Sequence, residues 1–228
     1  GVELGVVHEA VETIEQVVSQ ADLVVIAVPV QAFESVLIKI KPFLKQGVVI
    51  TDVGSVKGCF LDAVKAVFGS IPSFVVPGHP IAGSEKHGVL AADERLFKNH
   101  KVILTPTEDT CKSAVQLVKK LWKMAGASVI EMSVAHHDEV LAATSHLPHL
   151  LAFSLVDTLA GEEDSQEIFK YAAGGFRDFT RIAASDPVMW HDIFLANQDA
   201  LLKVLDHFNE DLSLLRKAIE NKKHHHFL

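Results

Sequence analysis

The sequence predicts an α/β domain with a parallel sheet in residues 1–132, followed by an all-α domain in residues 133–228. Short apolar runs alternate with amphipathic helical patterns in the first part, which is typical of βαβ units. After Ser133 the strand-like runs stop and longer helical periods replace them. The last predicted helix carries a long apolar stripe, from Trp190 to Leu215, which favours packing between two subunits of a homodimer.

Composition narrows the class of protein. The chain has 228 residues, of which 49% are hydrophobic, enough for a sizeable core. A net charge of −8 argues against a nucleic-acid partner. No apolar run approaches the roughly 20 residues of a membrane helix, so no membrane partner is expected. The two cysteines, Cys59 and Cys111, are expected to be reduced thiols of a cytoplasmic protein.

The first domain is expected to contain five buried strands, each an apolar run bounded by turn or polar residues. They cover residues 21–29, 47–53, 74–76, 101–106 and 127–132. Helical spacing predicts helices between them at residues 9–19, 31–44, 56–68 and 111–124. Gly126 can end the last of these helices in the left-handed conformation.

The second domain is expected to be built from helices. Ser133 is a suitable cap for a long helix from Ala135 to Leu159, which Pro148 should kink. A short helix at residues 166–171 is broken by the glycines at 174 and 175. The sequence Ser185-Asp186-Pro187 predicts the start of a final helix that runs to about Lys217.

His79 is the first candidate functional residue. It lies in residues 77–86, where two glycines and two prolines argue against regular structure, just after the strand at 74–76. Ligands of open α/β sheets bind at the carboxyl ends of strands. By itself the position fits either a titratable functional group or a turn histidine bonded to a neighbouring carbonyl.

Ser55 follows the strand at 47–53 in the same way. Its hydroxyl can cap the helix that starts at Val56, and the same position faces the ligand crevice. The two roles are compatible.

The helical domain offers two polar clusters. Ser145, His146 and His149 share one region of the long helix, but without a thiolate or acidic third ligand they do not predict a metal site. Arg177 and Arg181 lie one turn apart, with Asp178 between them. They are either a surface ion pair or a guanidinium fork for a carboxylate.

One expected motif is missing. A dinucleotide-binding half opens with a strand, Gly-x-Gly-x-x-Gly and a helix whose N-terminus holds the pyrophosphate. The sequence contains no such motif, nor the residue that would read the ribose. We therefore expect the first domain to be incomplete at its N-terminus.

Five motifs occur in a fixed order: Asp52-Val53-Gly54-Ser55-Val56-Lys57, residues 78–85 (GHPIAGSE), residues 145–149 (SHLPH), residues 175–183 (GFRDFTRIA) and residues 185–190 (SDPVMW). Together they resemble prephenate dehydrogenases, the cyclohexadienyl dehydrogenase family of tyrosine biosynthesis. The resemblance covers nearly the whole chain and implies a Rossmann-like first domain.

The resemblance implies oxidative decarboxylation of prephenate to 4-hydroxyphenylpyruvate, with hydride transfer to NAD⁺ or NADP⁺. His79 would accept a hydrogen bond from the C4 hydroxyl as a neutral imidazole, so activity should rise with pH through its pKa. Ser55 would lie beside it, near the nicotinamide. Feedback inhibition by tyrosine would also be compatible with the family.

The remaining roles are carried over by position. Arg181 would bind the ring carboxylate, oriented by Glu85 and Asp178, and Trp190 would reach the partner subunit's site. The full substrate set implied is Arg181, His149, Ser145, Glu85, Asp178, Trp190 and Gly174, and the cofactor set is Val28, Pro29, Asp52, Ser55 and Pro80.

Three alternatives stay open. The substrate can be arogenate rather than prephenate. A related hydroxy-acid dehydrogenase would need a catalytic lysine on the long helix, and residues 142–148 contain none. The chain can also be a binding and dimerisation module without catalytic activity.

Overall fold

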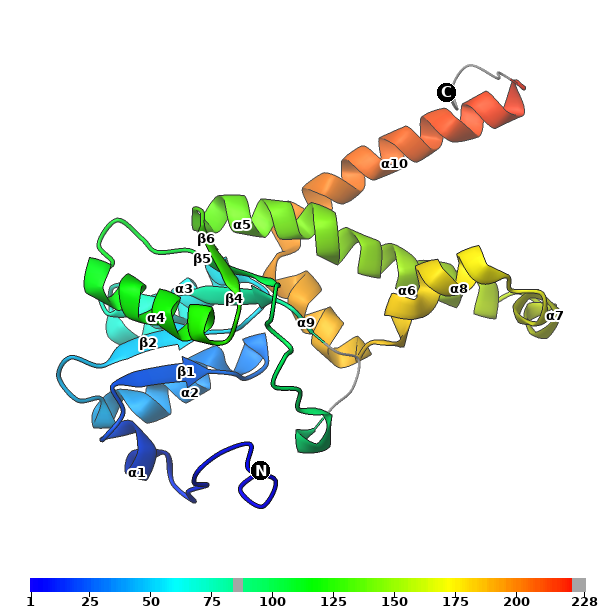
Figure 1. Cartoon of the computed structure of the whole chain (residues 1–228). Coiled ribbons are helices and arrows are strands. Elements are labelled where there is room, and N and C mark those ends of the chain that lie inside the picture. The colour runs from blue at the N-terminus through cyan, green and yellow to red at the C-terminus, as the bar shows by residue number, and fades with distance from the viewer. Residues whose placement is uncertain (84–87, 223–228) are drawn as a thin grey trace. The chain divides into compact units, whose positions relative to one another are not determined.

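The structure is a computed structural model that describes residues 1–83 and 88–222. Its contacts divide the chain into two compact units. The first contains residues 1–138 and 186–196, and the second contains residues 139–185 and the chain from 197 onward (Figure 1). Residues 186–196 thus return to the first unit, although they lie beyond the sequence-based boundary at residue 133.

The first unit contains the predicted parallel sheet. Strands β1 (Leu23–Ile26), β2 (Val49–Asp52) and β3 (Val75–Val76) pair in parallel in the order β1-β2-β3. In register, Ile26 lies opposite Asp52 and Thr51 lies opposite Val76. The carboxyl ends of β1 and β2 therefore meet at one edge, as the sequence predicted.

A second sheet corrects one expectation. Strand β4 (Gly78–Ile81) runs antiparallel to β5 (Lys101–Leu104), and β5 runs parallel to β6 (Ser128–Glu131). The prediction that the Gly- and Pro-rich stretch excludes regular structure was wrong for residues 78–81. Because β4 is an edge strand of its sheet, Pro80 is accommodated there without its N–H.

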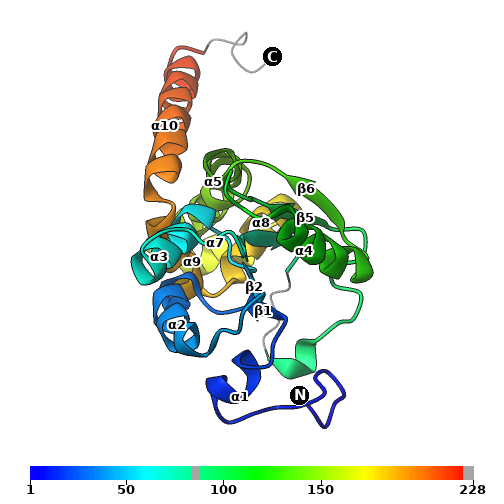
Figure 2. The same ribbon diagram turned by 90° about the vertical axis from the view of Figure 1, so that its left-hand side faces the viewer.

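Helices cover both faces of the parallel strands (Figure 2). On one face, Ile50 and Val75 pack with α2 (Phe33–Ile40) and α3 (Lys57–Phe68). On the other, Val49 and Val76 pack with α4 (Lys112–Met124). The period of two along each strand explains this division. Apolar side chains on both sides are what the continuous apolar runs predicted.

Shorter elements complete the first unit. They are α1 (Ile14–Val18), the 3₁₀ turns η1 (Val30–Ala32), η2 (Lys41–Phe43) and η3 (Val89–Ala91), and α9 (Pro187–Ala196). Helix α1 is shorter than the predicted helix at 9–19. The predicted left-handed Gly126 is confirmed, with φ of 84° after α4.

The long helix is interrupted as it enters the second unit. It comprises α5 (Val134–Leu141), a π-helical segment η4 (Ala142–His146) and α6 (Leu147–Ala160). Ser133 caps it, since its Oγ accepts the His136 N–H at 3.3 Å. Pro148 is the second residue of α6, two positions after the π-helical segment ends at His146, so the irregularity predicted at Pro148 lies just before it.

Three further helices follow. They are α7 (Ser165–Lys170), α8 (Gly174–Thr180) with the 3₁₀ turn η5 (Arg181–Ala184), and α10 (Gln198–Glu220). The final helix predicted from residue 185 onward is instead two helices, α9 and α10. They are separated at Asn197, whose φ of −118° and ψ of 35° lie outside the helical range.

One expectation about membranes also needs correction. The helical run Val134–Ala160 is long and apolar enough to cross a membrane by length and composition. Core helices of globular proteins pass the same test. The run contains His146, His149 and Pro148, and we interpret it as a helix of the all-α domain.

Candidate active site

A buried ion pair organises the end of β2. The side chains of Asp52 and Lys57 are both fully buried and form a salt bridge. Lys57 Nζ also donates to the Gly78 carbonyl at 2.6 Å, and Asp52 accepts the N–H groups of Gly54 at 2.9 Å and Gly78 at 3.1 Å. Burial raises the pKa of Asp52, and Lys57 and the two N–H groups oppose that shift. The pair ties β2, α3 and the start of β4 together.

His79 lies directly after Gly78, in β4 opposite Ile103. Gly78 permits close packing here, because a Cβ would lie 3.1 Å from the Asp52 carbonyl oxygen. The His79 ring is buried, and its Nδ1 lies 2.9 Å from Nε2 of His137, which is also fully buried. His137 Nδ1 in turn lies 2.8 Å from Asp138 Oδ1. A carboxylate and two imidazoles thus form one chain of hydrogen bonds.

Asp138 also caps α3. Its Oδ1 accepts the Lys57 N–H at 2.9 Å and its Oδ2 accepts the Gly58 N–H at 2.8 Å. The predicted capping role of Ser55 was therefore wrong: the N-cap residue is Val56, and the carboxylate from α5 supplies the acceptor. Local sequence suggested the serine because the real cap lies about 80 residues further along the chain.

A cavity of about 300 Å³ opens at the carboxyl ends of β1 and β2. Three cofactor candidates from the sequence, Val28, Pro29 and Ser55, line it together with Gly54. Helix α9 contributes Met189, Asp192 and Ile193. A Cβ on Gly54 would come within 2.4 Å of the Phe33 ring, so this position has no room for a side chain. The other two cofactor candidates, Asp52 and Pro80, are buried within the protein outside this lining.

The second unit gathers several substrate candidates. His149 Nδ1 donates to the carbonyl of Ser145, in the π-helical segment, at 2.8 Å. Burial lowers the pKa of His149, the hydrogen bond to Ser145 opposes the shift, and the positive charge of Arg181 adds to it. His149 and Arg181 are therefore electrostatic neighbours, and His149 is held neutral beside an exposed guanidinium.

The remaining candidates are dispersed. Gly174 starts α8, and Asp178 is exposed on the same helix. Trp190 belongs to α9 in the first unit, where it is buried and packs near Phe194, with ring centroids 5.6 Å apart. Glu85 lies outside the described residues.

Sequence reasoning missed His137, Asp138 and Lys57 as parts of the site. The signals were present but weak. Lys57 stands in an apolar helical stretch, and His137-Asp138 stands at the start of the long helix, next to the exposed His136. Only the fold shows that these residues meet Gly78 and His79.

Comparisons with known proteins show the family. Residues 1–131 match the family model "Prephenate dehydrogenase, nucleotide-binding domain", and residues 133–228 match "Prephenate dehydrogenase, dimerization domain". The chain belongs to the prephenate dehydrogenase family.

Individual relatives support the assignment. The chain is 44% identical to the cyclohexadienyl dehydrogenase of Zymomonas mobilis, over 92% of this chain and 72% of the relative. It is 41% identical to the prephenate dehydrogenase of Bacillus subtilis, over 96% of this chain and 59% of the relative. A crystal structure of prephenate dehydrogenase from A. aeolicus, in complex with hydroxyphenyl propionate and NAD⁺, superposes with a TM-score of 0.89 at 41% identity, over 97% of this chain and 77% of that one.

Prephenate dehydrogenases use NAD⁺. The cavity is a candidate place for part of this cofactor. It lies at the carboxyl edge of a parallel sheet, where dinucleotides bind. Its lining is largely apolar, with Ser55 and Asp192 as the polar side chains.

Proposed function

We propose that the protein is an NAD-dependent dehydrogenase that converts prephenate to 4-hydroxyphenylpyruvate and CO₂ in tyrosine biosynthesis. One observation carries the proposal. In a chain that matches both prephenate dehydrogenase domain models, a buried histidine is held in a strand by a hydrogen-bonded imidazole. The network therefore aligns a proton acceptor within the family's nucleotide-binding domain.

His79 is the proposed proton acceptor. As a neutral imidazole it accepts the proton of the C4 hydroxyl while the C4–O bond becomes a carbonyl. NAD⁺, when bound, accepts the hydride from C4. The C1–carboxylate bond then breaks, its electron pair enters the ring, and CO₂ leaves as the ring becomes aromatic. The driving force of aromatisation makes a metal or covalent nucleophile unnecessary.

Arg181 is the proposed ligand of the ring carboxylate. A planar guanidinium can bind a carboxylate with two parallel hydrogen bonds. The neighbouring His149 is held neutral by burial, so it can orient the substrate without adding a second positive charge. Ser145, Asp178, Gly174 and Glu85 complete the proposed substrate set, with Trp190 acting at the partner subunit's site.

Val28, Pro29 and Ser55 are proposed to contact the nicotinamide, because they line the cavity at the sheet edge. Asp52 would act indirectly, since its oxygens bind Lys57 and the N–H groups of Gly54 and Gly78. Pro80 would act by fixing the backbone beside His79 in β4. NADP⁺ remains an alternative cofactor.

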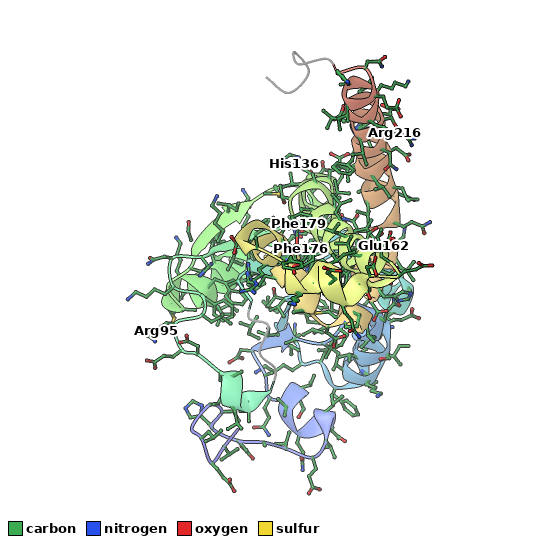
Figure 3. All side chains as sticks on the ribbon, turned by 90° about the vertical axis from the view of Figure 1, so that its right-hand side faces the viewer. Arg95, His136, Glu162, Phe176, Phe179 and Arg216 are labelled. Carbon is green, nitrogen blue, oxygen red and sulfur yellow. The ribbon has the colours of Figure 1, made fainter. Side chains whose placement is uncertain are left out.

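The proposal includes a homodimer in the cytoplasm. The second unit belongs to a dimerization domain model, and α10 leaves Leu202, Leu212, Leu214 and Ile219 at least 47% exposed. Figure 3 shows side chains projecting along this helix, with Arg216 labelled near its end. Both cysteines are free thiols, which suits a reducing compartment.

The test is an assay of nicotinamide reduction by the full-length protein with prephenate, arogenate and a simple 3-hydroxy acid. Turnover of prephenate is expected, and faster turnover of arogenate would favour the alternative substrate. His79→Asn should lower turnover by about a hundredfold or more while the KM for prephenate stays within a few-fold. Near-normal turnover of this variant would remove His79 from the mechanism, and reduction with the hydroxy acid alone would replace the proposed function.

A further inference from the structure

The two residues behind His79 carry a further inference. His137 and Asp138 were not among the candidate residues of the sequence, yet the fold places them in line with the proposed proton acceptor. The Nδ1 of His79 lies 2.9 Å from His137 Nε2, and His137 Nδ1 lies 2.8 Å from Asp138 Oδ1. The ring centroids of the two histidines are 5.1 Å apart at an interplanar angle of 62°, so they meet edge to face and not as a stack.

The donors around Asp138 determine its ionisation. It accepts the backbone N–H groups of Lys57 and Gly58 and also faces His137 Nδ1. Burial by itself would raise the pKa of Asp138, but the hydrogen bonds from His137, Lys57 and Gly58 outweigh burial and lower it. The carboxyl group is therefore a carboxylate, which accepts hydrogen bonds and cannot donate them.

The protonation of the two rings follows from this carboxylate. Because Asp138 can only accept, His137 must carry its proton on Nδ1. In a neutral imidazole the other nitrogen is then an acceptor, so His137 Nε2 accepts a hydrogen bond from His79. His79 must donate it from Nδ1, which makes Nε2 its basic nitrogen.

We propose that Asp138 and His137 are positioning residues that hold His79 in the Nδ1–H tautomer and direct its basic Nε2 toward the substrate hydroxyl. The inference rests on the proposed function, since it concerns the proton that His79 accepts. When His79 takes that proton, the imidazolium keeps its Nδ1–H bonded to His137, and the carboxylate of Asp138 polarises that acceptor. The pair thus both orients the ring and stabilises its charged form, as a carboxylate does behind a catalytic imidazole.

We call the chain of hydrogen bonds from Asp138 through His137 to His79 the relay. Other charged groups near it do not replace the positioning role of Asp138 and His137. Lys57 and Asp52 neutralise each other, and Lys57 also binds the Gly78 carbonyl. Cys59 on α3 is a protonated thiol, because burial raises its pKa to about 12, while Asp62 lies further along the same helix. From β5 the residue opposite His79 is the apolar Ile103, and the neighbouring His136 on α5 is exposed.

Nitrogen-15 spectra of the histidine rings test the tautomer without any assay of activity. In the full-length protein at neutral pH, long-range proton–nitrogen correlations should show His79 and His137 both protonated on Nδ1. Signals are assigned from the spectra of His79→Asn and His137→Gln. A neutral His79 that carries its proton on Nε2 would overturn the relay.

Kinetics test whether the relay serves catalysis. His137→Phe keeps a ring in the buried space but removes the acceptor for His79. We expect kcat to fall about tenfold or more, within the range for general-base effects, with KM for prephenate changed only a few-fold. The acidic limb of the kcat–pH profile should move to lower pH, because the imidazolium of His79 loses its stabilising acceptor. His137→Gln, which retains an acceptor oxygen, should recover part of both effects.

His136→Gln is the matched control, since this residue adjoins His137 but is exposed, and Figure 3 labels it. It should leave kcat and the pH profile unchanged. A His137→Phe variant with wild-type kcat and an unmoved acidic limb would overturn the positioning role. If the wild-type protein turns over none of the three substrates while His79 shows Nδ1–H, the proposed function fails but the tautomer assignment stands.

Discussion

Replacing Lys57 by Met should destabilise the protein strongly. Lys57 and Asp52 are both fully buried, and Lys57 also donates to the Gly78 carbonyl at 2.6 Å. Met fills most of the space of the lysine stem, so the loss is mainly electrostatic. Among the residues that the structure describes, the change leaves the buried carboxylate with the N–H groups of Gly54 and Gly78 as partners.

The expected cost is about 3–5 kcal/mol in the free energy of unfolding, the range for breaking one side of a buried pair. An exposed pair provides the comparison. Lys45 contacts Asp22 at 2.7 Å, but their side chains are 36% and 90% exposed. Lys45→Met should therefore cost at most about 1 kcal/mol.

The cost of Lys57→Met should also depend on pH. Without Lys57, burial raises the pKa of Asp52 in the folded variant further above its value in the unfolded chain. The folded variant then binds a proton more readily than the unfolded chain as pH falls from neutrality through that raised pKa. The difference in the free energy of unfolding between wild type and Lys57→Met should thus be greatest at neutral pH and become smaller in mild acid.

Urea unfolding of both variants, of Asp52→Asn and of Asp52→Asn/Lys57→Met measures these effects. The double variant should be less destabilised than Lys57→Met alone, because the uncompensated charge is gone. The reasoning is refuted if Lys57→Met costs no more than Lys45→Met, or if the two losses at Asp52 and Lys57 simply add.

Three further predictions concern the second unit and the cysteines. Arg181→Lys should raise the KM for prephenate more than tenfold, which corresponds to a loss of about 1.4 kcal/mol or more of binding free energy. Arg177→Lys should change the KM less. The reverse order in steady-state kinetics would move the carboxylate ligand to Arg177. Light scattering at micromolar concentration should give a dimer, and a monomer would contradict the role assigned to α10. Under native conditions iodoacetamide should label Cys111 before Cys59, as followed by mass spectrometry. Hydrogen bonds from Ser113 and the Ala114 N–H lower the pKa of Cys111, whereas burial raises the pKa of Cys59 to about 12. Equal labelling of the two thiols would contradict this prediction.

The sequence alone determined the strands of the parallel sheet and most of the helices. The parallel strands are apolar runs packed against helices, although Val25 of β1 is 41% exposed, so their signal is local. The capping residue Ser133 was also predictable, because its side chain bonds an N–H group three residues away. At the start of α9 the sequence predicted the helix start but suggested Ser185 as the cap, whereas Asp186 Oδ1 accepts the N–H groups of Val188 and Met189. The five ordered motifs placed the chain in its family for the same reason: each is a contiguous string of residues.

Tertiary structure decided those features of the fold and the site that depend on contacts between residues far apart in the sequence. His79 and His137 are 58 residues apart, and Asp138 caps a helix that begins 81 residues earlier, at Lys57. Strand β4 exists because β5 pairs with it, although its own residues argue for a turn. The break at Asn197 is a similar case. Helix α9 belongs to the first unit and α10 to the second, and the continuous apolar period across them could not reveal this division.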